Sequence, residues 1–319
     1  MKDLYIFYRN QELKFLEILH KNNVKCIEAN GLCIYKIDTL PEMLEELSLV
    51  EFYPLKSLIF IPKCLRILHL YETNISSIGI LPDTLQILSI CYSPIVFLPP
   101  LPDNIKRIDL YDTKIRHLDT LPESLIYLDI YYCKFLDKIP HFPQNLQELK
   151  LYKVNVSFLH PFPKSLKNLS LRNLPFLSKI PKLPNLIEFR YCSRLKEYII
   201  PRLPDTLEIL DIRNTKQDFD NSRDLSYLLS KRLPKMLQTL ILDISELDYT
   251  KTRCNQMKKL CNNSYLRHLC SKKISRSILQ NTCKKTVYSK VIEMKTESWI
   301  LIPYHQKCIN FGVYMKYIK

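Results

Sequence analysis

The stretch that decides the fold is LPDTLQILSICYSPIVFLPPLPDNIKRIDLYDTKIRHLDTLPESLIYLDI, which spans residues 81–130. A Leu-Pro pair recurs in it every 20 residues, with its prolines at Pro82, Pro102 and Pro122. Three residues after each proline, apolar residues follow at positions i, i+3 and i+5, which is the spacing of a turn that enters a short strand. A fixed period of this length predicts an array of stacked repeats. The three apolar sets are Leu85, Leu88, Ile90; Ile105, Ile108, Leu110; and Leu125, Leu128, Ile130.

The same pattern continues along most of the chain. A weaker repeat without the proline begins at Val24, so we expect about eleven repeats in residues 24–244. Residues 1–23 are then an N-terminal cap, because the open end of an array needs an atypical unit. Within this cap, residues 4–8 favour a strand, and residues 11–21 favour a short helix or an irregular first coil. The prolines that precede the pattern are 20 or 21 residues apart, except for one step of 30: Pro41, Pro62, Pro82, Pro102, Pro122, Pro143, Pro163, Pro184, Pro204 and Pro234.

Within one repeat, the alternation of a β-strand decides which side chains face the core. Leu128 and Ile130 are expected to point inward and Asp129 outward. Neighbouring parallel strands lie about 4.8 Å apart, so equivalent side chains form columns along the sheet. The return leg is too short for a full helix, and its prolines favour an extended, polyproline-like path.

The motif L-x-x-L-x-L is that of leucine-rich repeats, at the short end of their length range. Several repeats carry a second proline before the Leu-Pro pair, as in LPPLP at residues 98–102 and IPKLP at residues 180–184. The chain therefore resembles the LPxLP subclass of leucine-rich repeats found in bacterial type III secreted effectors and, more distantly, amoebal proteins with FNIP-type repeats. The resemblance implies an α/β solenoid of horseshoe form, with a parallel sheet on the concave face and mostly extended segments on the convex side.

The chain departs from this family at one position. Leucine-rich repeats usually place asparagine three residues after the last inward residue of the strand. Thr, Ser or Cys at that position can still make a weaker hydrogen bond to the turn, whereas Val154 and Leu174 cannot. We therefore expect a less regular loop in the second half of the array. The residues found at this position are Thr73, Ser93, Thr113, Cys133, Val154, Leu174, Arg194 and Thr215.

The outward columns of the strands carry the residue types that most favour binding. One column holds tyrosines in the first half of the array and arginines in the second, beside a column that contains acidic residues. Tyr and Arg dominate interaction hot spots because they bury a large area and keep a polar group. We therefore expect a non-catalytic scaffold that binds a protein partner on this face; the alternative is that tyrosines merely suit strand surfaces. The expected partner-binding residues are Tyr71, Tyr111, Tyr131, Tyr152, Asp109, Asp129, Arg172, Arg190 and Arg213.

The basic charge of the chain is concentrated at its C-terminal end. The formal net charge is +15 overall, and residues 245–319 hold 15 basic and 4 acidic residues, a net charge of +11. The repeat stops there, and helical spacing followed by β-branched segments predicts a small α+β C-terminal cap. Basic segments contact phosphates, so an alternative function is binding of nucleic acid or an anionic surface through residues 245–319. A solvated cap surface is the other interpretation, since no RRM, KH or zinc-finger pattern is present.

The step of 30 residues between Pro204 and Pro234 contains an insertion of about ten residues, a length that surface loops tolerate. Its segment at 221–231 begins with a potential N-cap and has leucines on one face. This pattern predicts a short helix on the outer side of the array. Such a helix is either a tolerated surface insertion or a docking element.

No catalytic or metal-binding signature is present in the sequence. The G-x-S-x-G, P-loop and H-E-x-x-H motifs are absent, and with 3 glycines the chain has little material for a phosphate-binding loop. Some effectors of the LPxLP subclass carry a C-terminal ubiquitin-ligase domain. That domain is much longer than residues 245–319, and no segment of this sequence matches it. We therefore expect no enzyme activity, no cofactor and no metal. The cysteines and histidine near the C-terminus lack the C-x-x-C pair of zinc modules: Cys254, Cys261, His268, Cys270 and Cys283.

The cysteine pattern and the hydropathy predict an intracellular location, in the cytoplasm or in a host cytoplasm. The 11 cysteines are scattered and odd in number, which favours a reducing compartment. The sequence contains no apolar run of about 18 residues, so it predicts no membrane span. Residues 1–10 lack the basic start and apolar stretch of a secretory signal.

Overall fold

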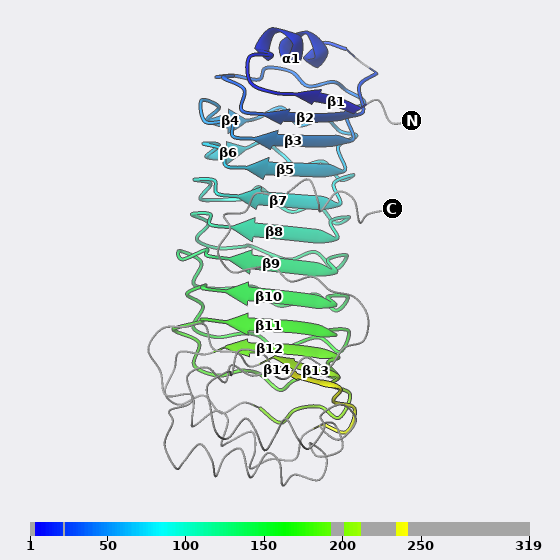
Figure 1. The fold of residues 1–319 in the computed structure, drawn as a ribbon, viewed down its shortest axis with the longest axis vertical. Helices are drawn as coiled ribbons and strands as arrows, with labels where there is room; N and C mark the ends of the chain where they lie inside the picture. The colour runs from blue at the N-terminus through cyan, green and yellow to red at the C-terminus, as the bar shows by residue number, and fades with distance from the viewer. Residues whose placement is uncertain (1–3, 22, 193–200, 212–233, 242–319) are drawn as a thin grey trace, which may run out of the picture. The chain divides into compact units, whose positions relative to one another are not determined.

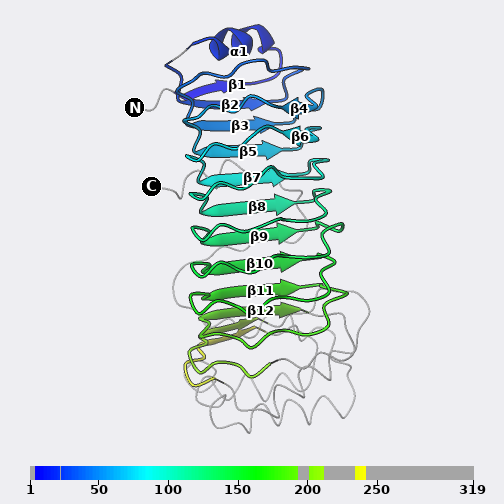
Figure 2. The same ribbon diagram turned by 180° about the vertical axis from the view of Figure 1, so that it is seen from behind.

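The computed structural model describes residues 4–21, 23–192, 201–211 and 234–241, and the structural statements below concern these residues. Twelve strands form one parallel sheet, in which the strand of each coil pairs with the strand of the next coil (Figures 1 and 2). In chain order these strands are β1 (Leu4–Phe7), β2 (Cys26–Asn30), β3 (Glu46–Val50), β5 (Ile67–Tyr71), β7 (Ile87–Cys91), β8 (Arg107–Tyr111), β9 (Tyr127–Tyr131), β10 (Glu148–Tyr152), β11 (Asn168–Arg172), β12 (Glu188–Cys192), β13 (Ile209–Asp211) and β14 (Thr239–Ile241).

Regular structure outside this sheet is sparse. Two short strands, β4 (Ser57–Leu58) and β6 (Ser77–Ile78), pair with each other on the return legs of their coils. Among the described residues, α1 (Glu12–Leu19) is the only helix. The predicted parallel β-solenoid, with return legs that are not helical, is therefore confirmed.

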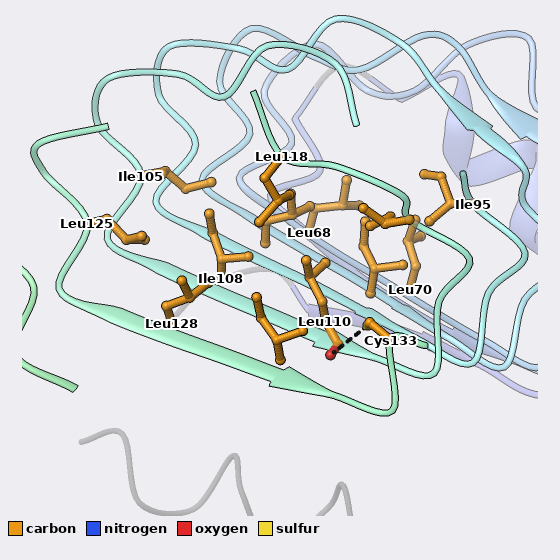
Figure 3. Close-up of a cluster of buried hydrophobic side chains, with 14 of the residues drawn as sticks. Leu68, Leu70, Ile95, Ile105, Ile108, Leu110, Leu118, Leu125, Leu128 and Cys133 are labelled. Atoms are coloured by element: carbon orange, nitrogen blue, oxygen red, sulfur yellow. Dashed lines mark hydrogen bonds between the residues drawn. The ribbon is translucent and has the colours of Figure 1, made fainter. Parts of the chain in front are cut away.

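The core lies between the sheet and the return legs. Leu128 pairs in register with Ile108 and Leu149, and all three side chains are fully buried. Figure 3 shows Leu68, Leu110 and Leu128 among the side chains of this layer. Each buried Leu or Ile stabilises the fold by about 2 kcal/mol through the hydrophobic effect. The predicted inward orientation of the strand leucines is confirmed.

The Leu-Pro motif closes each coil through a backbone hydrogen bond. The N–H of Leu85 donates to the carbonyl of Pro82 at 3.0 Å, and equivalent bonds recur in the coils from Pro41 to Pro163. Proline has a fixed φ and no N–H to donate, so it ends the extended leg where the turn begins. A side chain in this turn also reaches the previous coil: Ser124 Oγ donates to the carbonyl of Ile105 at 2.6 Å. The motif therefore directs both the path of a coil and its stacking.

The residue directly after each strand of the twelve-stranded sheet from β2 to β11 has a left-handed backbone conformation. Its N–H donates to a carbonyl at the end of the next strand, as from Lys153 to Arg172 at 3.0 Å. The irregular loop expected near Val154 and Leu174 is not found at this turn, because the preceding Lys153 and Asn173 keep φ values of 52° and 50°. The backbone bond fixes the turn, and the apolar side chain after it is buried in the core. The residues with positive φ directly after a strand are Gly31, Glu51, Glu72, Tyr92, Asp112, Tyr132, Lys153 and Asn173.

The N-terminal end of the core is covered by a strand and by a helix, which is one of the two alternatives that the sequence left open for residues 11–21. β1 pairs with β2 and is the edge strand of the sheet. Phe15 of α1 is fully buried, and its ring centroid lies 5.5 Å from that of Phe7 and 5.9 Å from that of Phe52. The domain division at residues 23 and 244 stays a prediction. The expected helix at 221–231, the C-terminal cap at 245–319 and the cysteine cluster within it lie outside the described residues.

Candidate functional site

The sheet face is defined here as the described outward side chains of β5 to β13, together with the residue that follows each sheet strand from β5 to β11. The strands pair without offset, so Tyr111, Tyr131, Tyr152 and Arg172 stand in one column. A second column contains the predicted Asp109, Asp129 and Arg190, with Lys150 and Ser170 between them. The structure thus places eight of the nine predicted residues on the sheet face, seven of them on the strands β8 to β12. Tyr71 is separated from Tyr111 by Cys91, and Arg213 lies outside the described residues.

Four tyrosines form a stacked group, which we call the tyrosine ridge: Tyr111, Tyr131, Tyr132 and Tyr152. The ring centroids of Tyr131 and Tyr152 are 4.5 Å apart with an interplanar angle of 15°, and those of Tyr111 and Tyr131 are 5.4 Å apart. Tyr132 joins from the turn after β9, at 5.0 Å from Tyr131 and 5.9 Å from Tyr152. Rings at equivalent positions of neighbouring strands come this close because the strand spacing matches the stacking distance of aromatic rings.

The sequence did not identify Tyr132, although it identified its three neighbours. Tyr132 follows the strand, where the alternation rule no longer applies. Its backbone is left-handed, with a φ of 60°, and its ring contacts that of Tyr131. Tyr71 is not part of the ridge, because its ring packs edge-on against Tyr92 with centroids 5.5 Å apart.

The two predicted aspartates are buried under the side chains around them. Asp109 and Asp129 are each 6% exposed. Asp109 accepts hydrogen bonds from Arg107 Nε at 2.7 Å and Nη2 at 3.1 Å. Asp129 accepts from the hydroxyls of Tyr111 at 2.6 Å and Tyr127 at 3.1 Å. Burial raises the pKa of both carboxyls above the usual range, although these hydrogen bonds oppose the shift.

Tyr127, which the sequence did not single out, connects these groups. The guanidinium of Arg107 lies 3.9 Å from the ring centroid of Tyr127, and the ammonium of Lys150 lies 4.9 Å from it. Lys150 Nζ also donates to the Tyr127 hydroxyl at 2.9 Å and pairs with Glu148 at 2.6 Å. Only the register could have revealed this role, since it places Tyr127 between Arg107 and Glu148 on the neighbouring strands.

The predicted arginines are paired within the chain as well. Arg172 Nη2 on β11 donates to Asp211 on β13 at 2.7 Å. This ion pair spans β12, which lies between the two strands. Arg190 pairs with Glu188 two residues earlier on the same strand. The charged residues of the sheet face are thus largely neutralised by one another.

Two lysines beside the tyrosine ridge differ from these paired charges. Lys153 Nζ donates to the Tyr132 hydroxyl and lies 4.2 Å from the Tyr132 ring centroid and 5.2 Å from that of Tyr152. The exposed Lys134 places its ammonium 5.5 Å from the Tyr132 ring centroid. In the part of the chain that the structure describes, neither ammonium lies within ion-pairing distance of a carboxylate.

Burial shifts the pKa values of a cysteine and a histidine on the sheet face. Burial raises the pKa of Cys91 to about 12, so its thiol stays protonated at neutral pH and is a poor nucleophile. Burial and the charge of Arg107 lower the pKa of His69 to about 4, so its imidazole is neutral under the same conditions. Across the described ranges, no three His, Cys, Asp or Glu side chains gather as a metal site would require.

The sequence matches no protein-family model and no curated protein. Among solved structures, the chain is similar to YopM from Yersinia enterocolitica WA-314, with 25% identity and a TM-score of 0.59 over 70% of this chain and 47% of that chain. The fold is that of a leucine-rich repeat protein. The chain spans about half the length of this YopM.

Two further leucine-rich repeat structures are similar at lower scores. CroV588, described as a circular leucine-rich repeat protein, has 18% identity and a TM-score of 0.40 over 75% of this chain and 43% of that chain. The leucine-rich effector YopM from Yersinia pestis has 18% identity and a TM-score of 0.31 over 70% of this chain and 84% of that chain. Within the described ranges of this chain, no helix has the length and hydrophobicity needed to cross a bilayer.

Proposed function

We propose that this leucine-rich repeat protein is a non-catalytic scaffold that binds a protein partner on its sheet face, the concave face expected from the sequence. Solenoids of this fold typically hold partners on a surface built from many repeats. The observation that carries the proposal is the tyrosine ridge. Its rings contact one another before any partner arrives, so binding costs less side-chain entropy than it would for separate tyrosines.

Within this proposal, seven of the predicted residues divide into two groups, whereas Tyr71 and Arg213 belong to neither. The tyrosines of the ridge contact the partner, because aromatic side chains dominate binding hot spots. Asp109, Asp129, Arg172 and Arg190 position their neighbours instead, since each already pairs within the chain. Asp129 in particular holds the hydroxyl of Tyr111 and so orients one end of the ridge.

Affinity capture with the full-length protein tests the proposal. Immobilised wild type and the double variant Tyr131→Ala/Tyr152→Ala are exposed to the same cell extract, and bound proteins are quantified by mass spectrometry. A partner of the sheet face should be retained by wild type and depleted at least tenfold by the double variant.

The matched control is Phe60→Ala/Phe176→Ala, which removes two exposed aromatic rings from the return legs. This control should retain the partner. A set of bound proteins that is identical for wild type and the ridge variant would contradict the proposal.

The basic segment at residues 245–319 supports a second candidate function. Its net charge of +11 favours contact with nucleic acid or an anionic surface. Binding of a labelled RNA or of anionic vesicles should then fall steeply as salt rises. A protein without residues 245–319 that binds these probes as well as the full chain does would eliminate this function.

Subclass and location complete the proposal. The doubled proline steps support membership of the LPxLP subclass of leucine-rich repeats. An intracellular location, in the cytoplasm or in a host cytoplasm, is supported by free thiols where the structure describes cysteines, at Cys26, Cys33, Cys64, Cys91 and Cys133. Fractionation of cells that express the protein tests this location.

A further inference from the structure

We propose that the sheet face takes an acidic, extended segment of its protein partner, which lies across the tyrosine ridge with carboxylates beside Lys134 and Lys153; this inference rests on the proposed function. The segment supplies carboxylates to two ridge lysines, whereas the carboxylate of Asp129 beside the ridge is already bonded to Tyr111. Aromatic rings and ammonium groups are present there, but no carboxylate pairs with either lysine among the described residues.

The described side-chain contacts of Lys153 and Lys134 are with tyrosine rings and a hydroxyl, and none of them is with a carboxylate. The ammonium of Lys153 lies over the rings of Tyr132 and Tyr152. The exposed Lys134 places its ammonium near the same Tyr132 ring. A cation at an aromatic face is attracted by the ring, and this attraction holds the ammonium in place without neutralising its charge. A carboxylate from a partner would add a charge-assisted hydrogen bond to an ammonium that is already in place.

The other cations of the sheet face are unsuitable for this purpose. Arg107, Lys150 and Arg190 each bond a carboxylate two residues away on their own strand. Arg172 bonds the carboxylate of Asp211, which is 1% exposed. A partner could use these cations only after it had broken an existing pair, so the two ridge lysines are the favoured anchors.

The charge along the turns also limits the length of the acidic contact. The left-handed turn positions hold Glu51, Glu72 and Asp112 in the earlier coils and change to Lys153 after β10. Among these turn positions, the acidic side chains thus lie up to Asp112, at the Tyr111 end of the ridge, and the positive charge lies at Lys153, at the Tyr152 end. A peptide with two or three carboxylates matches this pattern, whereas a nucleic-acid strand carries a phosphate at every nucleotide and would run into the acidic turns.

Selection from a random peptide library tests this inference directly. A phage library of twelve-residue peptides is panned on full-length wild type and, in parallel, on Lys134→Glu/Lys153→Glu. Peptides that bind wild type and not the variant should be enriched in Asp and Glu. A synthetic peptide of the consensus sequence should bind at least tenfold more weakly to the lysine variant and to Tyr131→Ala, as measured by fluorescence anisotropy.

The control variant Lys164→Glu/Lys167→Glu makes the same charge change at exposed lysines in the turn before β11. It should bind the consensus peptide as wild type does, and all variants should keep the wild-type melting temperature within a few degrees. A selection that yields no binder, or binders without acidic enrichment, overturns the inference. A twelve-nucleotide oligothymidylate that binds more tightly than the peptide, through the same lysines, also overturns it.

The two proposals fail separately. Peptides that are lost on Tyr131→Ala but kept on the lysine variant would refute the acidic segment and leave the sheet face as a protein-binding surface. Peptides that neither variant weakens would contradict both proposals.

Discussion

The hydroxyl of Tyr111 donates a 2.6 Å hydrogen bond to the carboxylate of Asp129 on the neighbouring strand. This bond joins one end of the tyrosine ridge to a carboxylate that is 6% exposed. A bond to a buried charge contributes more to stability than a bond between neutral groups. The relationship therefore couples the stability of the sheet to the surface that we propose for binding.

A double-mutant cycle on this pair should show strong coupling. Tyr111→Phe removes the donor and should lower the free energy of unfolding by about 1–2 kcal/mol. Asp129→Asn should also destabilise, and the double variant should lose less than the sum of the two single losses, by about 1 kcal/mol or more. Chemical denaturation measures all three variants. Losses that add within error would show that the bond is not a stabilising one.

His69 should make stability depend on pH below neutrality. Burial, with the nearby charge of Arg107, lowers its folded pKa to about 4, while the unfolded pKa is about 6.5. The unfolded state therefore binds more protons between these values, and stability falls as the pH falls. The loss from pH 7 to pH 4 should be roughly 2–3 kcal/mol.

The variant His69→Gln isolates this effect. Asp109 and Asp129 have raised pKa values, which favour the folded state as the pH falls and so oppose the histidine. The difference in unfolding free energy between wild type and His69→Gln removes their contribution, because both proteins contain the two aspartates. As the pH falls from 7 to 4, the unfolding free energy of wild type should decrease relative to that of His69→Gln. A difference that stays constant would contradict the prediction.

Gly79→Ala should disrupt the contact between β4 and β6. A Cβ atom at Gly79 would lie 1.8 Å from the carbonyl oxygen of Ile59 in the previous coil, so the backbones must separate. We expect a loss of about 2–3 kcal/mol, typical of overpacking. The adjacent Ile80→Ala is the control, because that side chain is 87% exposed and its removal should change stability by less than about 0.5 kcal/mol. Thermal denaturation compares the two variants.

Asp112→Gly, in contrast to Gly79→Ala, should not destabilise the protein. Asp112 has a φ of 47°, a conformation that glycine adopts without strain and that costs other residues about 1 kcal/mol. Stability should stay the same or rise by up to about 1 kcal/mol. Lys114→Gly, an exposed residue of the same turn whose φ is not positive, should destabilise instead. A clear loss of stability in Asp112→Gly would show that its side chain contributes more than the strain costs.

The regular features of the array could be predicted because each repeat carries its own copy of the signal. Leu128 and Ile130 alternate with Asp129, and that alternation alone assigns the inward and outward sides. The turn after the strand was less predictable: at Val154 the missing polar side chain suggested irregularity, yet the backbone bond from Lys153 to the next coil keeps the turn regular. Backbone hydrogen bonds between coils leave no trace in side-chain patterns.

The sequence by itself determined the repeat, the parallel sheet and the columns of side chains on its outer face, because a hydrophobic period leaves a chain of this kind one way to bury its leucines. Only the tertiary structure decided which outward residues are available. Asp129 and Arg172 read as exposed charges in the sequence, but they are paired with Tyr111 and Asp211 from other coils. Tyr127 and Tyr132 gained their roles in the same way. Such pairings depend on distances of a few ångströms across strands that are 18–39 residues apart in the chain, and only the stacking of the coils sets those distances.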